Sequence, residues 1–225
     1  MVSTPLEVHL CNAYTLSLVD GDDELRASLQ RAHLNLPDGT PVAWLGRSAG
    51  TTGPVRGPGL VGDVAKLGVP AGLRHYYFGG KEGVAARMAE RLAEHAPGLQ
   101  VAGTECPPFH ALTDEDLDEV ADRIRRSNAT IVWVGLGTPR QDYVVPRLAQ
   151  RLNMPIIPVG AAFDFWSGDV AEAPKWLHGT GLEWIHRLLS EPRRLARRYL
   201  FGNPRFLSSA ARHWIQGWLR SSGRR

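Results

Sequence analysis

Two short apolar runs within residues 131–174 each end at a glycine turn, and this pattern constrains the fold more than any other feature. The first run, Ile131 to Val134, stops at Gly135-Leu136-Gly137, and the second, Ile156 to Val159, stops at Gly160. Apolar runs of this length between turn residues are typical of buried strands. In α/β proteins a strand, a glycine turn and a helix start build anion and nucleotide sites. The pattern therefore predicts a cleft where the two strand ends meet.

The rest of the chain alternates in the same way between apolar runs and amphipathic segments. Further strands are expected at residues 7–11, 33–36, 75–78 and 99–102, and helices near 22–29, 44–47, 60–67, 81–95 and 113–124. Because strands and helices alternate, the sequence predicts the α/β class, with a Rossmann-like parallel sheet that carries helices on both faces. Polar or glycine turns follow four strands, at Asp38-Gly39, Gly79-Gly80, Gly135-Leu136-Gly137 and Gly160, and should gather at the carboxyl edge.

Charge divides the chain into two parts. The 225 residues carry a net charge of +3, but residues 175–225 hold 11 basic and 2 acidic side chains, or +9, which leaves −6 for the remainder. We expect an α/β catalytic domain at 1–180 and a basic helical appendage at 181–225. A basic tail on an acidic body points to an anionic partner for the tail.

Several function classes are excluded by missing patterns. Cys11 and Cys106 cannot form a disulfide framework, and no Cys/His spacing suggests zinc. The dinucleotide fingerprint fails because Arg140 occupies its third glycine position, and neither a Walker loop nor a nucleophile elbow occurs. No signal peptide or membrane-spanning run is evident, so we expect a cytoplasmic protein.

Longer motifs resemble those of one glycosyltransferase family. In chain order they are NAYT at 12–15, AHLNLPDG at 32–39, a segment that begins at Arg56, FGG at 78–80, GLGTPRQD at 135–142, GAAFDFWSG at 160–168, APKW at 173–176 and GLEWIHRLLSEPRR at 181–194. Together they cover roughly residues 8–205, and the chain resembles the WecG/TagA/CpsF family, glycosyltransferase family 26. Three positions differ from the family's usual residues, namely Leu10 in place of Thr, Asp142 in place of Glu and Glu172 in place of a basic residue.

The resemblance implies an inverting, metal-independent transferase. Its donor would be a UDP-sugar, and its acceptor an undecaprenyl-diphosphate-linked saccharide at the inner face of the cell membrane. Products of such reactions enter teichoic acid, capsule or exopolysaccharide. No cofactor and no nucleic-acid partner are expected. The sequence is compatible with both a monomer and a homo-oligomer.

Asp38 is the candidate catalytic base. It follows a short strand and is held between Pro37 and Gly39, so its carboxylate can face a cleft. The residues alone favour a turn aspartate, a common role for Pro-Asp-Gly. The resemblance implies instead that this aspartate takes the proton from the acceptor hydroxyl, which is worth roughly 10²–10⁴ in rate.

The other candidate residues are assigned to the substrates. Gly79, Gly80, Gly137 and Thr138 would offer backbone N–H groups to the diphosphate, and Arg56, Arg187, Arg194 and Arg198 would add positive charge. Gln141 and Asp164 are candidate contacts to uridine or sugar, with a solvent-facing helix residue and a buried acceptor as their structural alternatives. Of the family's Thr-x-Asn motif, in which Leu10 replaces the threonine here, Asn12 is present, and it is a further candidate substrate-binding residue. Asp20-Gly21-Asp22 matches the metal-binding D-x-D pattern, but acidic residues are favoured before any helix.

The tail from Pro204 onward predicts an amphipathic helix. Apolar pairs recur every four residues, at Phe206-Leu207, Ala210-Ala211, Trp214-Ile215 and Trp218-Leu219, with arginines between them. Such a helix suits an anionic membrane interface, and packing on the protein's own core is the alternative. A non-catalytic nucleotide-sugar-binding or scaffold protein of the same fold is the alternative function.

Overall fold

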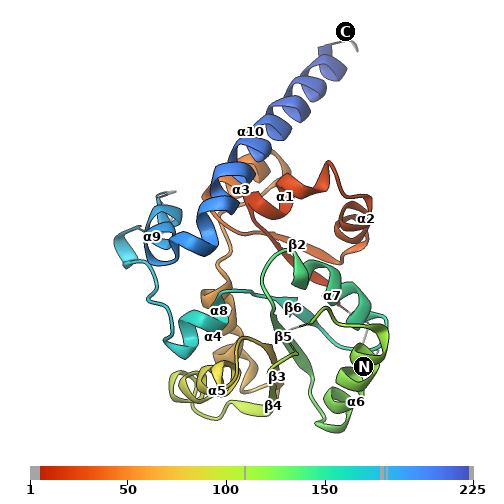
Figure 1. Cartoon of the computed structure of the whole chain (residues 1–225), viewed down its shortest axis with the longest axis vertical. Coiled ribbons are helices and arrows are strands. Elements are labelled where there is room, and N and C mark those ends of the chain that lie inside the picture. Colours follow the sequence, from red (N-terminus) through yellow and green to blue (C-terminus); the bar gives the residue numbers. More distant parts are fainter. Residues whose placement is uncertain (1–5, 109, 178–179, 181, 223–225) are drawn as a thin grey trace. The chain divides into compact units, whose positions relative to one another are not determined.

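The computed structural model describes residues 6–108, 110–177, 180 and 182–222. The chain divides into two compact units (Figure 1). Unit 1 comprises residues 1–10, 28–36 and 55–172, and unit 2 comprises residues 11–27, 37–54 and 173–225. The expected boundary at residue 180 stays a prediction.

Unit 1 is built on a four-stranded parallel sheet with the strand order β4-β3-β5-β6. Strand β3 pairs with β4 on one side and with β5 on the other, and Gly79 lies opposite Gly135. This arrangement confirms the α/β class and the parallel sheet. The strands are β3 (Arg74–Gly79), β4 (Gln100–Glu105), β5 (Ile131–Gly135) and β6 (Ile156–Pro158).

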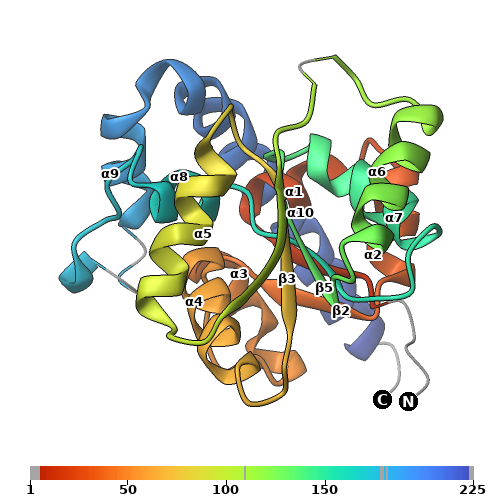
Figure 2. The same cartoon turned by 90° about the horizontal axis from the view of Figure 1, so that it is seen from below.

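Helices cover both faces of this sheet, as Figure 2 shows. Helices α4 and α5 lie on one face, and α6 and α7 lie on the other. Side chains alternate between the faces because successive residues of a strand point in opposite directions. The helices are α4 (Gly57–Gly68), α5 (Val84–His95), α6 (Asp114–Arg126), α7 (Arg140–Ala149) and the short α8 (Ala162–Ser167).

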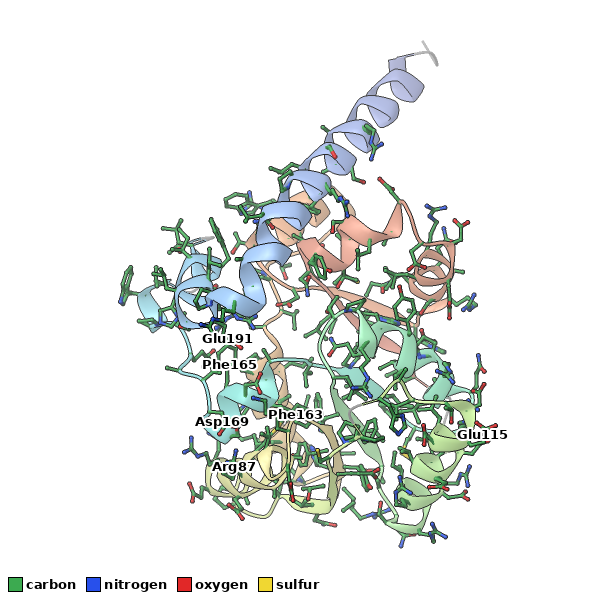
Figure 3. The ribbon with its side chains drawn as sticks, viewed as in Figure 1. Arg87, Glu115, Phe163, Phe165, Asp169 and Glu191 are labelled. Carbon is green, nitrogen blue, oxygen red and sulfur yellow. The ribbon has the colours of Figure 1, made fainter. Side chains whose placement is uncertain are left out.

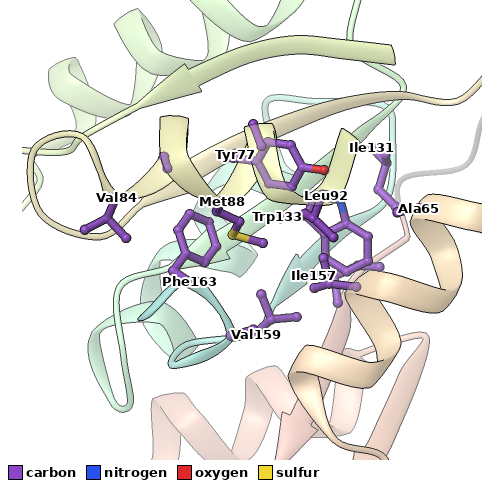
Figure 4. Close-up of a cluster of buried hydrophobic side chains, with 14 of the residues drawn as sticks. Ala65, Tyr77, Val84, Met88, Leu92, Ile131, Trp133, Ile157, Val159 and Phe163 are labelled. Atoms are coloured by element: carbon purple, nitrogen blue, oxygen red, sulfur yellow. The ribbon is translucent and has the colours of Figure 1, made fainter. Parts of the chain in front are cut away.

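The core beside α5 is rich in aromatic side chains (Figure 4). Tyr77, Trp133 and Phe163 are almost completely buried there. Trp133 Nε1 donates to His75 Nδ1 over 3.0 Å. Burial lowers the pKa of His75 to about 4, so this imidazole is neutral and accepts the indole hydrogen bond at physiological pH.

Local signals explain where two of the helices begin. Helix α6 begins at a Thr-x-x-Asp capping box, as the residues 113–116 predict, since Thr113 Oγ1 accepts from the Asp116 N–H and the Asp116 carboxylate accepts from the Thr113 N–H. The helix expected from residue 81 begins only at Val84. Gly83, which precedes it, has a φ of 76°, a left-handed conformation that a helix interior does not allow.

The segments before α4 contain one helix that the sequence analysis did not assign. Strands β1 (Val8–Cys11) and β2 (Leu34–Pro37) form a two-stranded sheet, and α2 (Asp23–Arg31) lies between them in sequence. The unassigned helix is α1 (Ala13–Val19), which Asn12 caps. The connection between the helices expected near 44–47 and 60–67 is shorter than predicted, because a 3₁₀ turn runs to Ala49 and α4 starts at Gly57.

Unit 2 is mainly helical. Its elements besides α1 are α3 (Thr40–Leu45), the 3₁₀ turns η1 (Gly46–Ala49) and η2 (Lys175–Leu177), α9 (Glu183–Ser190) and α10 (Pro192–Ser222). Among the described residues, no helix has the length and apolar character that a membrane span requires.

Helix α10 packs against α1 within unit 2. A Cβ at Gly202 would lie only 2.8 Å from Cδ2 of Tyr14, so the glycine permits the close approach. Phe206 is 5% exposed, and Arg212 Nη2 lies 2.8 Å from Asp20 Oδ2. The prediction that Pro204 opens a helix is wrong, because α10 begins at Pro192, where a proline suits the first turn, and continues through Pro204.

Candidate active site

Asp38 lies directly after β2, where its backbone is fixed on both sides. Its N–H donates to the carbonyl of Cys11 over 2.9 Å. Gly39, with a φ of 91°, turns the chain into α3. The Asp38 side chain is partly exposed. The strand end and the glycine turn therefore hold this carboxylate at the surface of unit 2.

Asn12 directly follows Cys11, the last residue of β1. The hydrogen bond between the Asp38 N–H and the Cys11 carbonyl therefore brings Asn12 next to Asp38. Asn12 Oδ1 accepts from the N–H groups of Tyr14 and Thr15, over 3.0 and 3.1 Å. These are the N-cap contacts of α1. Asn12 thus has a structural function that would orient the first turn of α1 beside the candidate base.

The two glycine turns of unit 1 lie side by side. A Cβ at Gly79 would lie 2.5 Å from the Cα of Gly135, and the N–H of Gly80 donates to the Gly135 carbonyl over 3.0 Å. Gly79 and Gly80 have φ values of 151° and 74°. The predicted gathering of turns is therefore confirmed for this pair, although the N–H of Gly80 bonds within the protein.

Gln141 links the Gly135-Leu136-Gly137 turn to the Gly160 turn. It is 4% exposed, and its Oε1 accepts from the N–H of Gly137 over 3.1 Å. A Cβ at Gly160 would lie 3.3 Å from the same Oε1. Gln141 is therefore a buried side chain that supports the turn containing Gly137 and Thr138. The structural alternative from the sequence analysis, a solvent-facing helix residue, is wrong. The assignment of Gln141 as a substrate contact stays a prediction.

Arg140, the neighbour of Gln141, holds the loop that follows β4. Its Nη2 donates to the carbonyls of Pro108 and His110, over 3.0 and 2.6 Å. Cys106 Sγ lies 3.5 Å from the Gly80 carbonyl. The segment after β4 therefore borders the Gly79-Gly80 turn, a relationship that the sequence analysis did not anticipate.

Arg56 and Asp164 occupy other positions in unit 1. Arg56 precedes α4 and forms an ion pair with Glu172 at 2.7 Å. Asp164 lies in the first turn of α8 and is partly exposed. Its neighbours in sequence are Phe163 and Phe165, which Figure 3 labels. Glu172, which stands where the family usually has a basic residue, thus balances the charge of Arg56.

A second ion pair ties α8 to α5. Arg87 Nη2 donates to both carboxylate oxygens of Asp169, each over 2.8 Å (Figure 3). Gly168, with a φ of 79°, ends α8 and turns the chain towards this contact. The segment that carries Asp164 is therefore held at its C-terminal end.

A buried ionic cluster in unit 1 was missed by the sequence analysis. His9 is 0% exposed, and its Nε2 lies 2.8 Å from Glu7 Oε1. Its Nδ1 faces Oδ1 of the fully buried Asp142 at 3.9 Å. Ser28 Oγ donates to the same Glu7 oxygen over 3.0 Å. Glu7 directly precedes β1 and His9 lies in it, two residues on, and that spacing in the strand expected at 7–11 was the available signal.

Charge attraction dominates this cluster. Burial acts to lower the pKa of His9, but the Asp142 and Glu7 carboxylates outweigh it and raise that pKa above the usual value. Burial acts to raise the pKa of Glu7, but His9 and Ser28 lower it overall. The raised pKa favours the protonated form of His9, which lies between the carboxyl groups of Glu7 and Asp142 and connects β1 to the first turn of α7, which carries Gln141.

The tail arginines lie in unit 2. Arg187 is in α9, and its Nη2 lies 3.9 Å from Glu191 Oε2. Arg194 and Arg198 belong to α10 by their backbone, and their side chains lie outside the described residues. Among the described side chains, no group of three or more His, Cys, Asp or Glu residues is arranged to hold a metal ion.

The candidate residues are distributed over both units. Unit 2 holds Asp38, Asn12 and the tail arginines, whereas unit 1 holds Arg56, Asp164, Gln141 and the glycine turns. Within each unit the structure brings neighbours together, namely Asn12 with Asp38, and Gly137 with Gln141.

Comparison with known proteins shows to which family the chain belongs. The model of the glycosyl transferase WecG/TagA/CpsF family matches residues 3–220. A relative from Bacillus spizizenii, an N-acetylglucosaminyldiphosphoundecaprenol N-acetyl-β-D-mannosaminyltransferase, is 28% identical over 190 residues, which cover 83% of this chain and 71% of the relative. The chain belongs to the WecG/TagA/CpsF family and is a glycosyltransferase.

Proposed function

We propose that this glycosyltransferase moves a sugar from a UDP-sugar to an undecaprenyl-diphosphate-linked saccharide during the synthesis of a cell-surface polysaccharide. The name of the relative specifies a lipid-diphosphate-linked acceptor and an N-acetylhexosaminyl group, and the chain aligns with most of it. The observation that carries the proposal is the position of Asp38, fixed by backbone contacts after β2 and partly exposed.

The proposed reaction is a single displacement that inverts the anomeric carbon. The Asp38 carboxylate accepts the proton of the acceptor hydroxyl as that oxygen attacks the anomeric carbon of the donor. The bond between the anomeric carbon and the diphosphate oxygen breaks at the same time, and UDP leaves with the electron pair. Each turnover therefore converts one O–H bond and one glycosyl–phosphate bond into a glycosidic bond and protonated Asp38.

The leaving diphosphate needs fixed positive charge or N–H donors. The N–H of Gly137 donates to Gln141 in this structure, so a bound phosphate would replace that side chain as its acceptor. Arg56 and the tail arginines Arg187, Arg194 and Arg198 are the proposed cations. We assign no metal to this step, because arginine and backbone donors suffice in principle to stabilise a diphosphate.

The decisive experiment is a screen of UDP-sugars with an undecaprenyl-diphosphate-linked acceptor and the full-length protein. Turnover of one donor with inversion at the anomeric carbon supports the proposal. Binding of UDP without turnover of any donor would favour the non-catalytic nucleotide-sugar-binding alternative. Retention of a nicotinamide cofactor instead of UDP would exclude both of these functions.

A further inference from the structure

The ion pair between Arg56 and Glu172 joins two segments of unit 1 that are far apart in the sequence. Arg56 is the N-cap of α4, and Glu172 belongs to the segment that follows α8. Arg56 Nη2 lies 2.7 Å from Glu172 Oε1, and the two side chains are 24% and 38% exposed. A cation that we assign to the donor diphosphate is therefore paired with a carboxylate of the protein itself, and both groups are accessible from solution.

Packing places the start of α4 at the carboxyl edge of the parallel sheet. A Cβ at Gly57 would lie 2.9 Å from the carbonyl oxygen of Val159, which directly precedes the Gly160 turn. A Cβ at Gly160 would lie 3.3 Å from Oε1 of Gln141, the side chain that supports the proposed diphosphate turn. Arg56 precedes Gly57, so this chain of contacts brings its backbone to the same edge as the glycine turns.

The backbone that carries Arg56 is fixed by contacts other than the ion pair. Trp166 Nε1 donates to the carbonyl of Pro58, in the first turn of α4, over 2.9 Å. One turn further on, a Cβ at Gly62 would lie 2.9 Å from Cζ2 of the same ring, so α4 packs closely on α8. Ion pairs that are open to solvent contribute little to stability. Glu172 is therefore not required to hold α4 in place.

The segment that carries Glu172 also has contacts of its own. The N–H of Val170 donates to the carbonyl of Asp164 over 3.1 Å. Asp169 accepts from Arg87 through both carboxylate oxygens. The Glu172 carboxylate can therefore leave Arg56 by rotation of its side chain, while these contacts keep the backbone of the segment in place.

Charge determines which anion Arg56 prefers. A carboxylate and a phosphate both accept charge-assisted hydrogen bonds from a guanidinium. A nucleoside diphosphate carries more negative charge than one carboxylate, so it can replace Glu172 at Nη2 of Arg56. Because the existing ion pair must first break, the apparent affinity for the diphosphate is lower than an unpaired arginine would give.

We propose that Glu172 competes with the donor diphosphate for the Arg56 guanidinium and thereby sets the affinity of the enzyme for UDP-sugar and for the product UDP. This inference rests on the proposed function, which assigns Arg56 to the diphosphate. The contact between Arg56 and Glu172 breaks as the contact between Arg56 and phosphate forms. The ion pair forms again when UDP leaves, so Glu172 favours release of the product.

The test measures the affinities of UDP and of uridine for the full-length protein by calorimetric titration. Glu172→Gln should bind UDP about three- to fivefold more tightly than the wild-type protein, and Glu172→Lys should bind it more tightly still. The affinity for uridine should not change, because uridine carries no phosphate. In the transfer assay, KM for the donor should fall by the same factor. A gain in affinity cannot arise from a folding defect.

Matched variants give the controls. Asp63→Asn removes the same charge from an exposed position of α4 and should leave the affinity for UDP unchanged. In an Arg56→Ala background, Glu172→Gln should no longer strengthen the binding of UDP. Equal gains with and without Arg56 would assign the effect to the general electrostatic field, and the inference of a competing ion pair would be overturned.

Two further outcomes separate this inference from the proposed function. If the wild-type protein transfers sugar from a UDP-sugar and Glu172→Gln binds UDP no more tightly, only the inference is overturned. Weaker binding of UDP by that variant would show that Glu172 orients Arg56 instead of competing for it. If the wild-type protein binds no UDP, the proposed function fails, and the inference fails with it.

Discussion

Nδ1 of His9 faces Oδ1 of Asp142 across 3.9 Å, and both side chains are completely buried. Glu7 lies on the other side of the same imidazole. Because burial penalises an unpaired charge strongly, the three groups depend on one another. The cluster connects β1 to the first turn of α7, next to Gln141, so it supports the turn that Gln141 contacts.

We predict that His9→Ala destabilises the protein by about 3–5 kcal/mol, since it removes the imidazole between Glu7 and the fully buried Asp142. Chemical denaturation monitored by circular dichroism measures this loss. His110→Ala, which removes an exposed histidine, serves as the control and should change stability by less than about 0.5 kcal/mol. Similar stabilities for the two variants would contradict the structural role of His9.

We predict a two-sided dependence of stability on pH from the same cluster. The pKa of His9 is raised above 6.5, so its stabilisation is complete below pH 6.5 and is lost as pH rises through the raised value. The pKa of Glu7 is lowered below 4.5, so its stabilisation is complete above pH 4.5 and is lost as pH falls through the lowered value. Ser28 and Arg31 also act on Glu7.

Denaturant midpoints measured from about pH 3 to about pH 9 test this dependence. His9→Gln should remove the decline of stability on the alkaline side. An unchanged alkaline decline in that variant would assign the effect to another group.

We predict that Asp38→Asn lowers sugar transfer by at least about 10²-fold, because the amide cannot accept the acceptor proton. Folding and UDP binding should persist, since the backbone contacts of residue 38 do not involve the side chain. Asp63→Asn, at an exposed position of α4, is the matched control. Near-normal turnover by the Asp38 variant would remove this residue from the mechanism.

We predict that sugar transfer continues in excess chelator. Arginines and backbone donors are the proposed partners of the leaving diphosphate. Initial rates with and without EDTA measure this directly. A loss of activity that Mg²⁺ or Mn²⁺ restores would contradict this prediction and would indicate a metal site at Asp20 and Asp22.

We predict that the end of the tail binds anionic membranes. Phe206 and Arg212 pack or pair within unit 2, so the informative deletion removes residues 213–225 and keeps those contacts. Each arginine near an anionic surface contributes on the order of 1 kcal/mol. Co-sedimentation with anionic vesicles at low and high salt should show weaker binding by the truncated protein. Equal binding would assign the tail to protein contacts.

The sequence alone was sufficient for the features that depend on neighbouring residues. The runs at Ile131 and Ile156 predict strands because each ends at glycine, and the capping box at Thr113 predicts a helix start through contacts three residues apart. Helix α1 was missed although Asn12 is a suitable N-cap, because its seven residues show too little periodicity. Family motifs also led to Asp38, whose catalytic function stays a prediction.

Tertiary structure decided the features that join distant parts of the chain. The His9–Asp142 pair depends on the packing of β1 against α7, and the burial of Gln141 depends on the approach of the Gly137 and Gly160 turns. Pro204 continues α10 rather than starting it, because α10 packs along α1 on both sides of the proline. Local propensity determined where strands and helices form, whereas burial and charge pairing between remote residues determined which side chains support the site, since those free energies arise only after the chain has folded.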